Sequence, residues 1–360
     1  MTEQNNKKAW FIMFNNTKFL IVRLSSIGDV LHATPVARTL KENYPNCHIT
    51  WIVSKTAADL LKHNPDIDEL FIWSREEFEK AASNLNICKV IQSWQTLKNF
   101  FKQHQFDIVL DIHGLFMSGI ITRLSQSKRR IGMAGTRELN RFFMTELAPT
   151  VDSPHMIKRY LSVLQQLGLK TNDYHLTLSL PNQFDTFAKD FFAKYKINPL
   201  KKTLMINPRT SWPNKNWGNL HFASCIDLLD PEIQLIISGG PSDKKDVAEI
   251  IAATNKPIIN IAGKTSLMEM AALLKNIDLL LTGDTGALHI ATAVMTPTIS
   301  LWGPTRPEQY GPLVKGHTFI CSDNKCRNCN KTKCRYKTNA CMNRIEPSSV
   351  AKKIHSLLTL

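Results

Sequence analysis

The chain has 360 residues, of which 43% are hydrophobic, and this length and apolar content suit two domains, each with a core of its own. No apolar run approaches the ~20 residues of a membrane-spanning helix, and the apolar stretch 9–14 is too short for the core of a signal peptide, so we expect a soluble, cytoplasmic protein. The formal net charge of +15 favours polyanionic partners (nucleic acid, an anionic membrane surface or phosphorylated ligands), unless it serves solubility alone.

Buried-strand and amphipathic-helix patterns alternate through the first half of the chain, which is typical of a parallel sheet covered on both faces. Residues 112–160 are less regular and could hold a flexible loop facing an acceptor, although helical spacing returns at 155–167. We predict strands at 19–24, 48–53, 69–73 and 107–111, and helices at 30–43, 57–61 and 96–104.

The same alternation restarts after a predicted linker at 172–185, so the two halves look like two versions of one architecture. We predict domains at 1–180 and 181–345, and a C-terminal helix in 346–360 that packs across the two lobes. The strands of the second half are expected at 203–207, 234–238, 258–261, 277–281 and 298–302, and its helices at 220–229, 244–253, 267–274 and 287–294.

The loop after the first strand carries Ser25, Ser26, Gly28 and Asp29. Gly28 lets the backbone turn tightly and leaves room for a ligand. Asp29, at the start of the next helix, can take a proton from an attacking hydroxyl. The alternative is that Asp29 only caps the helix, where a carboxylate is favoured.

A similar loop in the second half runs from Thr282 to His289. Its backbone amides and the following helix N-terminus make an anion site that suits a diphosphate. Asp284 could bind a sugar hydroxyl, and His289 could reach the same ligand one helical turn later. The alternative is an ordinary strand–turn–helix in which Asp284 or Thr285 is the cap.

Two further strand-end loops lie in the second half. The first, 207–217, offers the cation Lys215 and the hydroxyls of Thr210 and Ser211 as a diphosphate clamp. The second, 238–243, offers Asp243 to a ribose. Neither a Walker P-loop nor a G-x-G-x-x-G is present, which argues against an NTPase or an NAD enzyme.

Together these segments resemble glycosyltransferase family 9, the ADP-heptose:lipopolysaccharide heptosyltransferases, over nearly the whole chain. The resemblance rests on motifs in the family's order: Arg23–Pro35, Asp111–Leu115, His155–Tyr160, Asn207–Arg209, Ser238–Pro241, Ile261–Leu267, Thr282–His289, Gly303–Thr305 and Gly311–Pro312.

The resemblance implies a GT-B fold: two Rossmann-like, doubly wound parallel-sheet lobes facing a central cleft, with the acceptor on the N-terminal lobe. It implies inverting transfer of heptose from ADP-heptose to a Kdo- or heptose-bearing lipopolysaccharide inner core, without a cofactor or catalytic metal. Asp29 matches the general base, and Arg23 fits a diphosphate or an acidic acceptor. Residues matching donor contacts are Thr210, Ser211, Lys215, Asp243, Asp284, Thr285, Gly286 and His289.

Such an enzyme would act on the inner face of the cytoplasmic membrane, where a basic protein is held by anionic lipid. One alternative is a family member with a protein or another polysaccharide as acceptor. The other is a basic protein that binds nucleotides or nucleic acid without transfer activity, although no RNA-recognition or zinc-finger signature is present and no nucleic acid is expected as partner.

The segment 321–341 contains a compact group of cysteines. In a cytoplasmic protein such a group suggests structural zinc or iron rather than disulfides, and reduced thiols in a packed loop are the main alternative. We do not place this cluster in the catalytic site. Its members are Cys321, Cys326, Cys329, Cys334 and Cys341.

Overall fold

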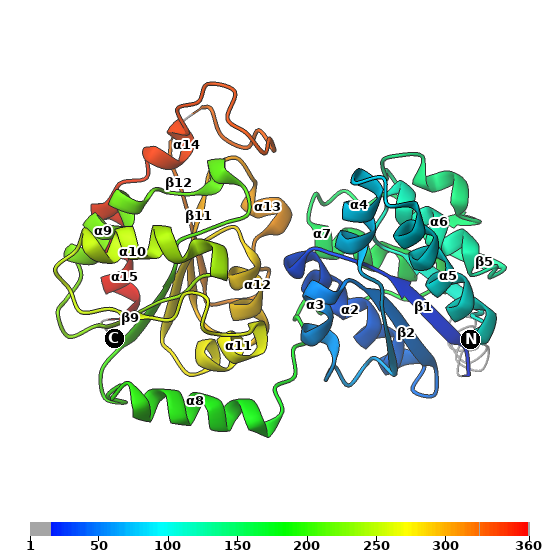
Figure 1. Cartoon of the computed structure of the whole chain (residues 1–360), viewed down its shortest axis with the longest axis horizontal. Coiled ribbons are helices and arrows are strands. Elements are labelled where there is room, and N and C mark those ends of the chain that lie inside the picture. The colour runs from blue at the N-terminus through cyan, green and yellow to red at the C-terminus, as the bar shows by residue number, and fades with distance from the viewer. Residues whose placement is uncertain (1–15, 324, 359–360) are drawn as a thin grey trace, which may run out of the picture. The chain divides into compact units, whose positions relative to one another are not determined.

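The computed structural model describes residues 16–323 and 325–358, so the apolar stretch 9–14 lies outside the described residues. The contacts between residues divide the chain into two compact units, Met1–Ser179 and Leu180–Leu360. Each unit has one sheet with helices packed around it (Figure 1).

The first unit is a six-stranded sheet in the order β3-β2-β1-β4-β5-β6, and its strands pair in parallel throughout. Its core joins apolar side chains of the central strands to those of helices α4, α5 and α6. The strands are β1 (Lys18–Val22), β2 (His48–Val53), β3 (Glu69–Ile72), β4 (Ile108–Asp111), β5 (Arg129–Gly132) and β6 (Glu146–Leu147). The helices are α2 (Ile27–Asn43), α3 (Lys55–Leu61), α4 (Arg75–Ser83), α5 (Ile87–Gln103), α6 (Phe116–Leu124) and α7 (Met156–Leu161), with 3-10 turns η1 (Asn140–Phe143) and η2 (Ser162–Leu167).

The sequence analysis missed several elements of this unit. Residues 112–160 contain α6, β5, β6 and the start of α7, joined by irregular stretches, and an acceptor-facing loop among them stays a prediction. The helix predicted at 96–104 is the last part of the longer α5, and α4 was not predicted at all. Helix α4 buries only Phe78 and Ala81, so its apolar pattern is short. Helix α5 has a longer apolar stripe, of which Leu97 and Phe100 are buried.

The second unit repeats the design, with a parallel six-stranded sheet in the order β12-β11-β10-β7-β8-β9. Its edge strand β12 was not predicted. The strands are β7 (Thr203–Asn207), β8 (Gln234–Ile237), β9 (Ile259–Asn260), β10 (Leu279–Gly283), β11 (Thr298–Trp302) and β12 (His317–Cys321). The helices are α8 (Asn182–Lys194), α9 (Asn219–Asp227), α10 (Lys244–Ala252), α11 (Leu267–Lys275), α12 (Gly286–Ala293), α13 (Pro307–Tyr310), α14 (Ala340–Asn343) and α15 (Pro347–Leu358), with turns η3 (Pro213–Lys215) and η4 (Pro241–Asp243).

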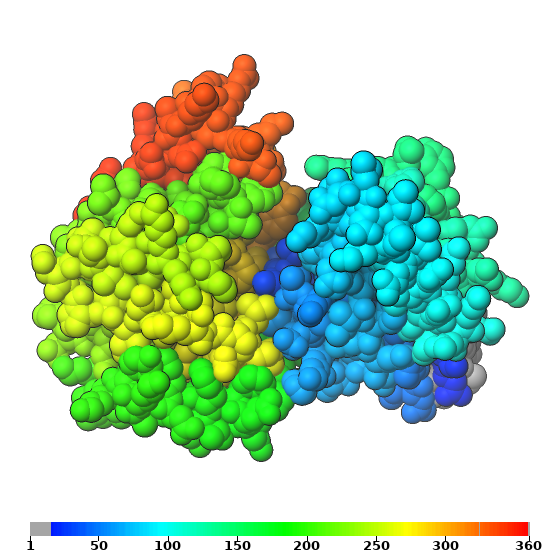
Figure 2. Space-filling view, in the orientation of Figure 1, coloured from blue at the N-terminus to red at the C-terminus, as the bar shows by residue number. Residues whose placement is uncertain are grey.

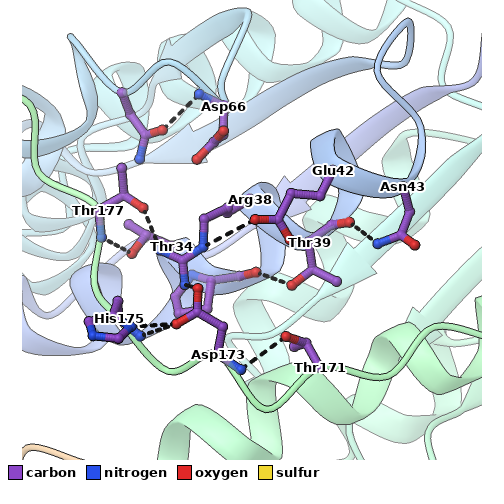
Figure 3. Close-up of polar contacts among 12 residues, drawn as sticks. Thr34, Arg38, Thr39, Glu42, Asn43, Asp66, Thr171, Asp173, His175 and Thr177 are labelled. Carbon is purple, nitrogen blue, oxygen red and sulfur yellow. Dashed lines mark hydrogen bonds and ion pairs between the residues drawn. The ribbon is translucent and has the colours of Figure 1, made fainter. Parts of the chain in front are cut away.

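The segment before the second unit is bound to helix α2. Arg38 of α2 forms an ion pair with Asp173 at 3.1 Å and donates a hydrogen bond to Thr177 Oγ1 at 3.2 Å (Figure 3). The backbone amide of Thr177 donates to Thr34 Oγ1 at 2.9 Å. The predicted linker 172–185 is therefore shorter than expected, because its start is fixed to α2 and its last residues begin helix α8.

The C-terminal helix α15 packs in the second unit, where Val350, Ala351 and Ile354 join the core together with side chains of α9. The indole of Trp217 donates to the backbone oxygen of Ile345, just before this helix, at 2.9 Å. Packing of α15 across the two lobes stays a prediction. In the described part of the chain, every helix is too short or too polar to cross a bilayer.

Both sheets reverse their strand order at one point, between β1 and β4 in the first unit and between β7 and β10 in the second. In open α/β sheets, ligands bind outside the carboxyl ends of the strands at such a reversal. The loops after β1 and β4, and those after β7 and β10, are therefore where each unit can form a site.

Candidate functional site

Asp29 lies in the first turn of α2, beside the reversal point of the first sheet. Its Oδ2 forms an ion pair with Arg23 at 2.7 Å and accepts a hydrogen bond from Ser26 Oγ at 3.0 Å. Its Oδ1 accepts a hydrogen bond from the hydroxyl of Tyr160 at 2.7 Å. The Asp29 side chain is 25% exposed, so a substrate can reach this carboxylate although three protein groups hold it.

These partners keep Asp29 charged. Burial alone would raise the pKa of this carboxyl, but the Arg23 guanidinium, the Tyr160 hydroxyl and His32 outweigh burial and lower the pKa to about 2. Ser26 and Asp29 also form a capping box at the start of α2. Capping and a chemical role, which the sequence posed as alternatives, are thus compatible at this residue.

A second group of residues surrounds the same loop. Asp111, at the end of β4, accepts hydrogen bonds from the backbone amides of His113 and Gly114, both at 3.0 Å. This fixes His113, whose Nε2 lies 3.2 Å from Arg75 Nη1. Burial and the positive charges of Arg23 and Arg75 lower the pKa of His113 to about 3, so its ring is neutral. Arg75 also lies 3.5 Å from Ser25 Oγ.

A cavity of about 560 Å³ opens between the end of β3 and helices α4 and α5. Trp73 and Phe78 supply apolar walls, and Asn86, Lys89 and Gln92 supply polar groups. Ser74, another lining residue, directly precedes Arg75. The cavity has both apolar and polar lining groups, although none of the side chains that contact Asp29 lines it.

In the second unit, the loops after β7 and β10 bring Lys215, Asp284 and His289 together. Lys215 Nζ lies 2.7 Å from Asp284 Oδ2, and His289 Nε2 lies 3.9 Å from Asp284 Oδ1. Burial by itself would raise the pKa of Asp284, but His289 and Lys215 hold it well below its usual range. Lys215 Nζ also lies 4.2 Å from the ring centre of Trp212, a cation–π contact.

The remaining predicted donor contacts surround this group to different degrees. Thr210 lies beside Gly283, because a Cβ at Gly283 would be 2.9 Å from Thr210 Cγ2. Thr285 caps helix α12 and Gly286 is its first residue, which places that helix N-terminus directly after Asp284. Ser211 is exposed. Asp243 is held in its own loop, where it accepts the Gly240 amide at 2.7 Å.

Three buried side-chain oxygens near these loops have no hydrogen-bond partner among the described residues. They are Asn214 Oδ1, Thr282 Oγ1 and Thr305 Oγ1. Buried polar atoms are normally satisfied. Since the three follow or end β7, β10 and β11, they are suited to binding a polar ligand at the carboxyl edge of this sheet.

The cysteine-bearing segment is connected to the same edge. Figure 2 shows this orange-red segment projecting from the body of the second unit. The backbone amides of Asn328 and Asn330 donate to Gly303 and Pro304 at 2.9 and 2.8 Å, and Asn214 Nδ2 donates to the Lys331 oxygen at 2.7 Å. The segment therefore contacts the loops after β11 and β7, which the sequence did not indicate.

Cys321, Cys329, Cys334 and Cys341 of the segment are free thiols. Within residues 16–323 and 325–358, His, Cys, Asp and Glu side chains form no group of three or more that could hold a metal ion. The prediction of structural zinc or iron therefore finds no support in the side-chain arrangement. The backbone amide of Asn339, with those of neighbouring residues, lowers the pKa of the Cys334 thiol.

Several residues at the two sites were not among the predicted site residues. Tyr160 and His113 lie in segments that the sequence singled out only for a resemblance, so their motifs were the available signal. Arg75 and Trp212 carried no signal of their own. Arg23 was expected to contact substrate, but its guanidinium is engaged by Asp29 and by the Ile112 oxygen at 3.0 Å.

Comparison with known proteins gives a consistent result. The sequence profile of glycosyltransferase family 9 (heptosyltransferase) matches residues 94–340. The chain is 30% identical to the lipopolysaccharide core heptosyltransferase OpsX of Haemophilus influenzae, over 81% of this chain and 80% of that protein. It is also 30% identical to lipopolysaccharide heptosyltransferase 3 of Escherichia coli K12, over 77% and 80% of the two chains.

Solved structures share the fold. A glycosyltransferase family 9 structure from Veillonella parvula aligns with a TM-score of 0.79 and 23% identity, over 95% of this chain and 97% of that one. The E. coli ADP-heptose lipopolysaccharide heptosyltransferase II aligns with a TM-score of 0.72 and 20% identity, over 95% and 98%. These alignments match the arrangement of two parallel sheets with the GT-B fold.

Proposed function

Because the chain belongs to glycosyltransferase family 9, the heptosyltransferases, we propose that it transfers heptose from ADP-heptose to the core saccharide of lipopolysaccharide. The relatives named above are lipopolysaccharide heptosyltransferases, and a related E. coli enzyme, WaaC, has been solved with ADP. The observation that carries the proposal is the group of Lys215, Asp284 and His289 at the reversal point of the second sheet.

We propose that this group binds the diphosphate and sugar of the donor. The transition state of glycosyl transfer resembles an oxocarbenium ion, and the leaving ADP gains negative charge. Lys215 and the N-terminus of α12 offer positive charge to it, and these groups serve without a catalytic metal. The unpartnered oxygens of Thr282, Asn214 and Thr305 can accept hydrogen bonds from donor hydroxyls.

We propose Asp29 as the general base. It is ionised, partly exposed, and lies at the corresponding edge of the first sheet. In an inverting transfer, the acceptor hydroxyl loses its proton to this carboxylate as its oxygen attacks the anomeric carbon. The acceptor would be a Kdo- or heptose-bearing inner core, with its saccharide near the cavity between α4 and α5.

We also propose that the protein works at the cytoplasmic face of the inner membrane, bound peripherally to anionic lipid. The segment 325–337 contains six Lys and Arg side chains and no acidic residue, and all six are exposed. Each basic side chain near an anionic membrane surface contributes about 1 kcal/mol of attraction. The six residues are Lys325, Arg327, Lys331, Lys333, Arg335 and Lys337.

The first test is to incubate the purified protein with ADP-heptose and Kdo2-lipid A, without added metal, and to follow ADP release and acceptor mass. A mass gain of one heptose supports both the reaction and the acceptor class. Unchanged rates with EDTA support a metal-free reaction. Tight ADP-heptose binding without product would contradict the proposed acceptor and leave the proposed donor unaffected.

The role of Asp29 is tested with Asp29→Asn. Turnover should fall at least about 100-fold, since general base catalysis contributes 10²–10⁴, while donor affinity stays within about twofold. Asp59→Asn, an exposed carboxylate on α3, is the matched control and should retain full activity. Retained turnover in Asp29→Asn would remove Asp29 as the base.

A further inference from the structure

Tyr160 and Arg23 each bind a different carboxylate oxygen of Asp29. Tyr160, on helix α7, is fully buried, and its hydroxyl donates to Oδ1 at 2.7 Å. Arg23, which is 6% exposed, contacts Oδ2 at 2.7 Å. The Arg23 guanidinium carbon lies 5.0 Å from the centre of the Tyr160 ring, so the two holding groups also contact each other.

The two oxygens are not equivalent. Besides Arg23, Oδ2 faces Ser26 Oγ at 3.0 Å and the Ser26 amide at 3.5 Å. Oδ1 accepts one hydrogen bond, from Tyr160. A carboxylate has about four lone-pair sites, two on each oxygen. Oδ2 is therefore already crowded by donors, whereas Oδ1 keeps a position for one more proton.

We propose that Tyr160 and Arg23 are positioning residues that select Oδ1 of Asp29 as the proton acceptor of the transfer. This inference rests on the proposed role of Asp29 as base. As the acceptor oxygen bonds to the anomeric carbon, its proton passes to Oδ1. The bond from the anomeric carbon to the phosphate oxygen breaks, and its electron pair leaves with ADP. Tyr160 keeps its own proton and donates throughout, and solvent later removes the proton from Asp29.

The same contacts keep the Asp29 carboxylate ionised, and therefore able to accept a proton, over the whole physiological pH range. A buried carboxyl would otherwise become neutral as its pKa rises. Here Arg23, Tyr160, His32 and Ser26 together outweigh burial. Arg23 is the largest of these effects, so its loss should raise the pKa of Asp29.

The first test is Tyr160→Phe, with Tyr44→Phe as the matched control. Tyr44 is also buried in the first unit, and its hydroxyl donates to the Leu167 oxygen at 3.4 Å, away from Asp29. We expect kcat to fall about 10- to 100-fold in Tyr160→Phe, because displacement of a catalytic group by about 1 Å can cost 10²-fold. Donor affinity and acceptor KM should stay within about twofold, and Tyr44→Phe should keep its kcat.

The second test is the pH dependence of kcat in Arg23→Gln. In the native enzyme no acid limb from Asp29 is expected above pH 4, because the pKa is about 2. In Arg23→Gln the limb should move to higher pH, toward the ordinary aspartate value of about 4. Unfolding midpoints of each variant, taken at each pH, verify that the protein is folded.

The inference is overturned if Tyr160→Phe keeps kcat within twofold, if Tyr44→Phe loses as much, or if the acid limb of Arg23→Gln lies at the same pH as that of the native enzyme. Failure of the underlying base assignment looks different, because Asp29→Asn would then retain turnover. An inactive Asp29→Asn together with an unchanged Tyr160→Phe would reject the positioning role alone.

Discussion

Replacing Asp284 by asparagine should destabilise the second unit strongly, because the change leaves the ammonium of Lys215 buried without its counter-charge. Asp284 is 7% exposed, and the Lys215 side chain is 11% exposed. Asparagine has nearly the same shape, so the loss of charge is the main perturbation. Breaking a buried ion pair by removing one partner costs about 3–5 kcal/mol.

For a unit of this size, each kcal/mol shifts the unfolding midpoint by about 2–4 °C, so a decrease of about 6–20 °C is expected by scanning calorimetry. The matched control is Glu232→Gln. Glu232 forms an ion pair with Lys201 at the same 2.7 Å, but the two side chains are 72% and 42% exposed. An exposed pair contributes about 0–1 kcal/mol, so the control should lose less than about 4 °C.

The pH dependence gives an independent measure. The pKa of Asp284 is lower in the folded protein than in the unfolded chain. Its stabilising contribution is therefore present above about pH 4 and is lost as the pH falls toward the folded pKa. The difference between the native protein and Asp284→Asn should be constant from pH 8 to about 5 and shrink below pH 4. Equal losses in Asp284→Asn and Glu232→Gln would refute the reasoning.

Three further predictions concern the surface segment and the titrating groups. Replacing Lys331 and Lys333 by glutamate should weaken binding to phosphatidylglycerol vesicles about tenfold or more at low salt. Binding to neutral phosphatidylcholine vesicles should be unchanged. Equal binding of the native protein to both kinds of vesicle would contradict the membrane proposal. Iodoacetamide should modify Cys334 before Cys225, because the pKa of Cys334 is lowered whereas burial raises the pKa of Cys225 to about 12. Peptide mass analysis measures the order, and the reverse order would contradict these pKa directions. Burial lowers the pKa of His317 to about 4, so the native protein should lose stability as the pH falls from about 6.5 to 4. His317→Gln should lose less stability over the same range. Parallel curves of stability against pH for the two proteins would exclude His317 as the cause.

The strand and helix order was largely predictable because periodicity is a local property of the chain. Strand β7 is fully buried, and β1 and β2 are buried apart from their first residues, so their apolar runs were clear. The pattern was weak where an element lies at an edge or on the surface. The edge strand β12 and the exposed helix α4 were missed for that reason.

The candidate loops were also predictable, because Asp29 and Asp284 follow buried strands directly and strand order places such loops at one edge. The side chains that bind these two carboxylates were not predictable. Tyr160 binds Asp29 from 131 residues away, and Lys215 binds Asp284 from 69 residues away. Nothing local in the sequence relates such distant side chains.

The amino-acid sequence by itself determined the α/β class, the duplicated architecture, the strand-end loops and the residues that carry the family resemblance. Only the tertiary structure decided which groups surround each carboxylate, that burial and the charges of Arg23 and Arg75 keep His113 neutral, and that the cysteine segment contacts the loops after β7 and β11. The physical reason is that apolar periodicity is written in neighbouring residues, whereas pKa values and ion pairs depend on burial and on charges that folding brings together.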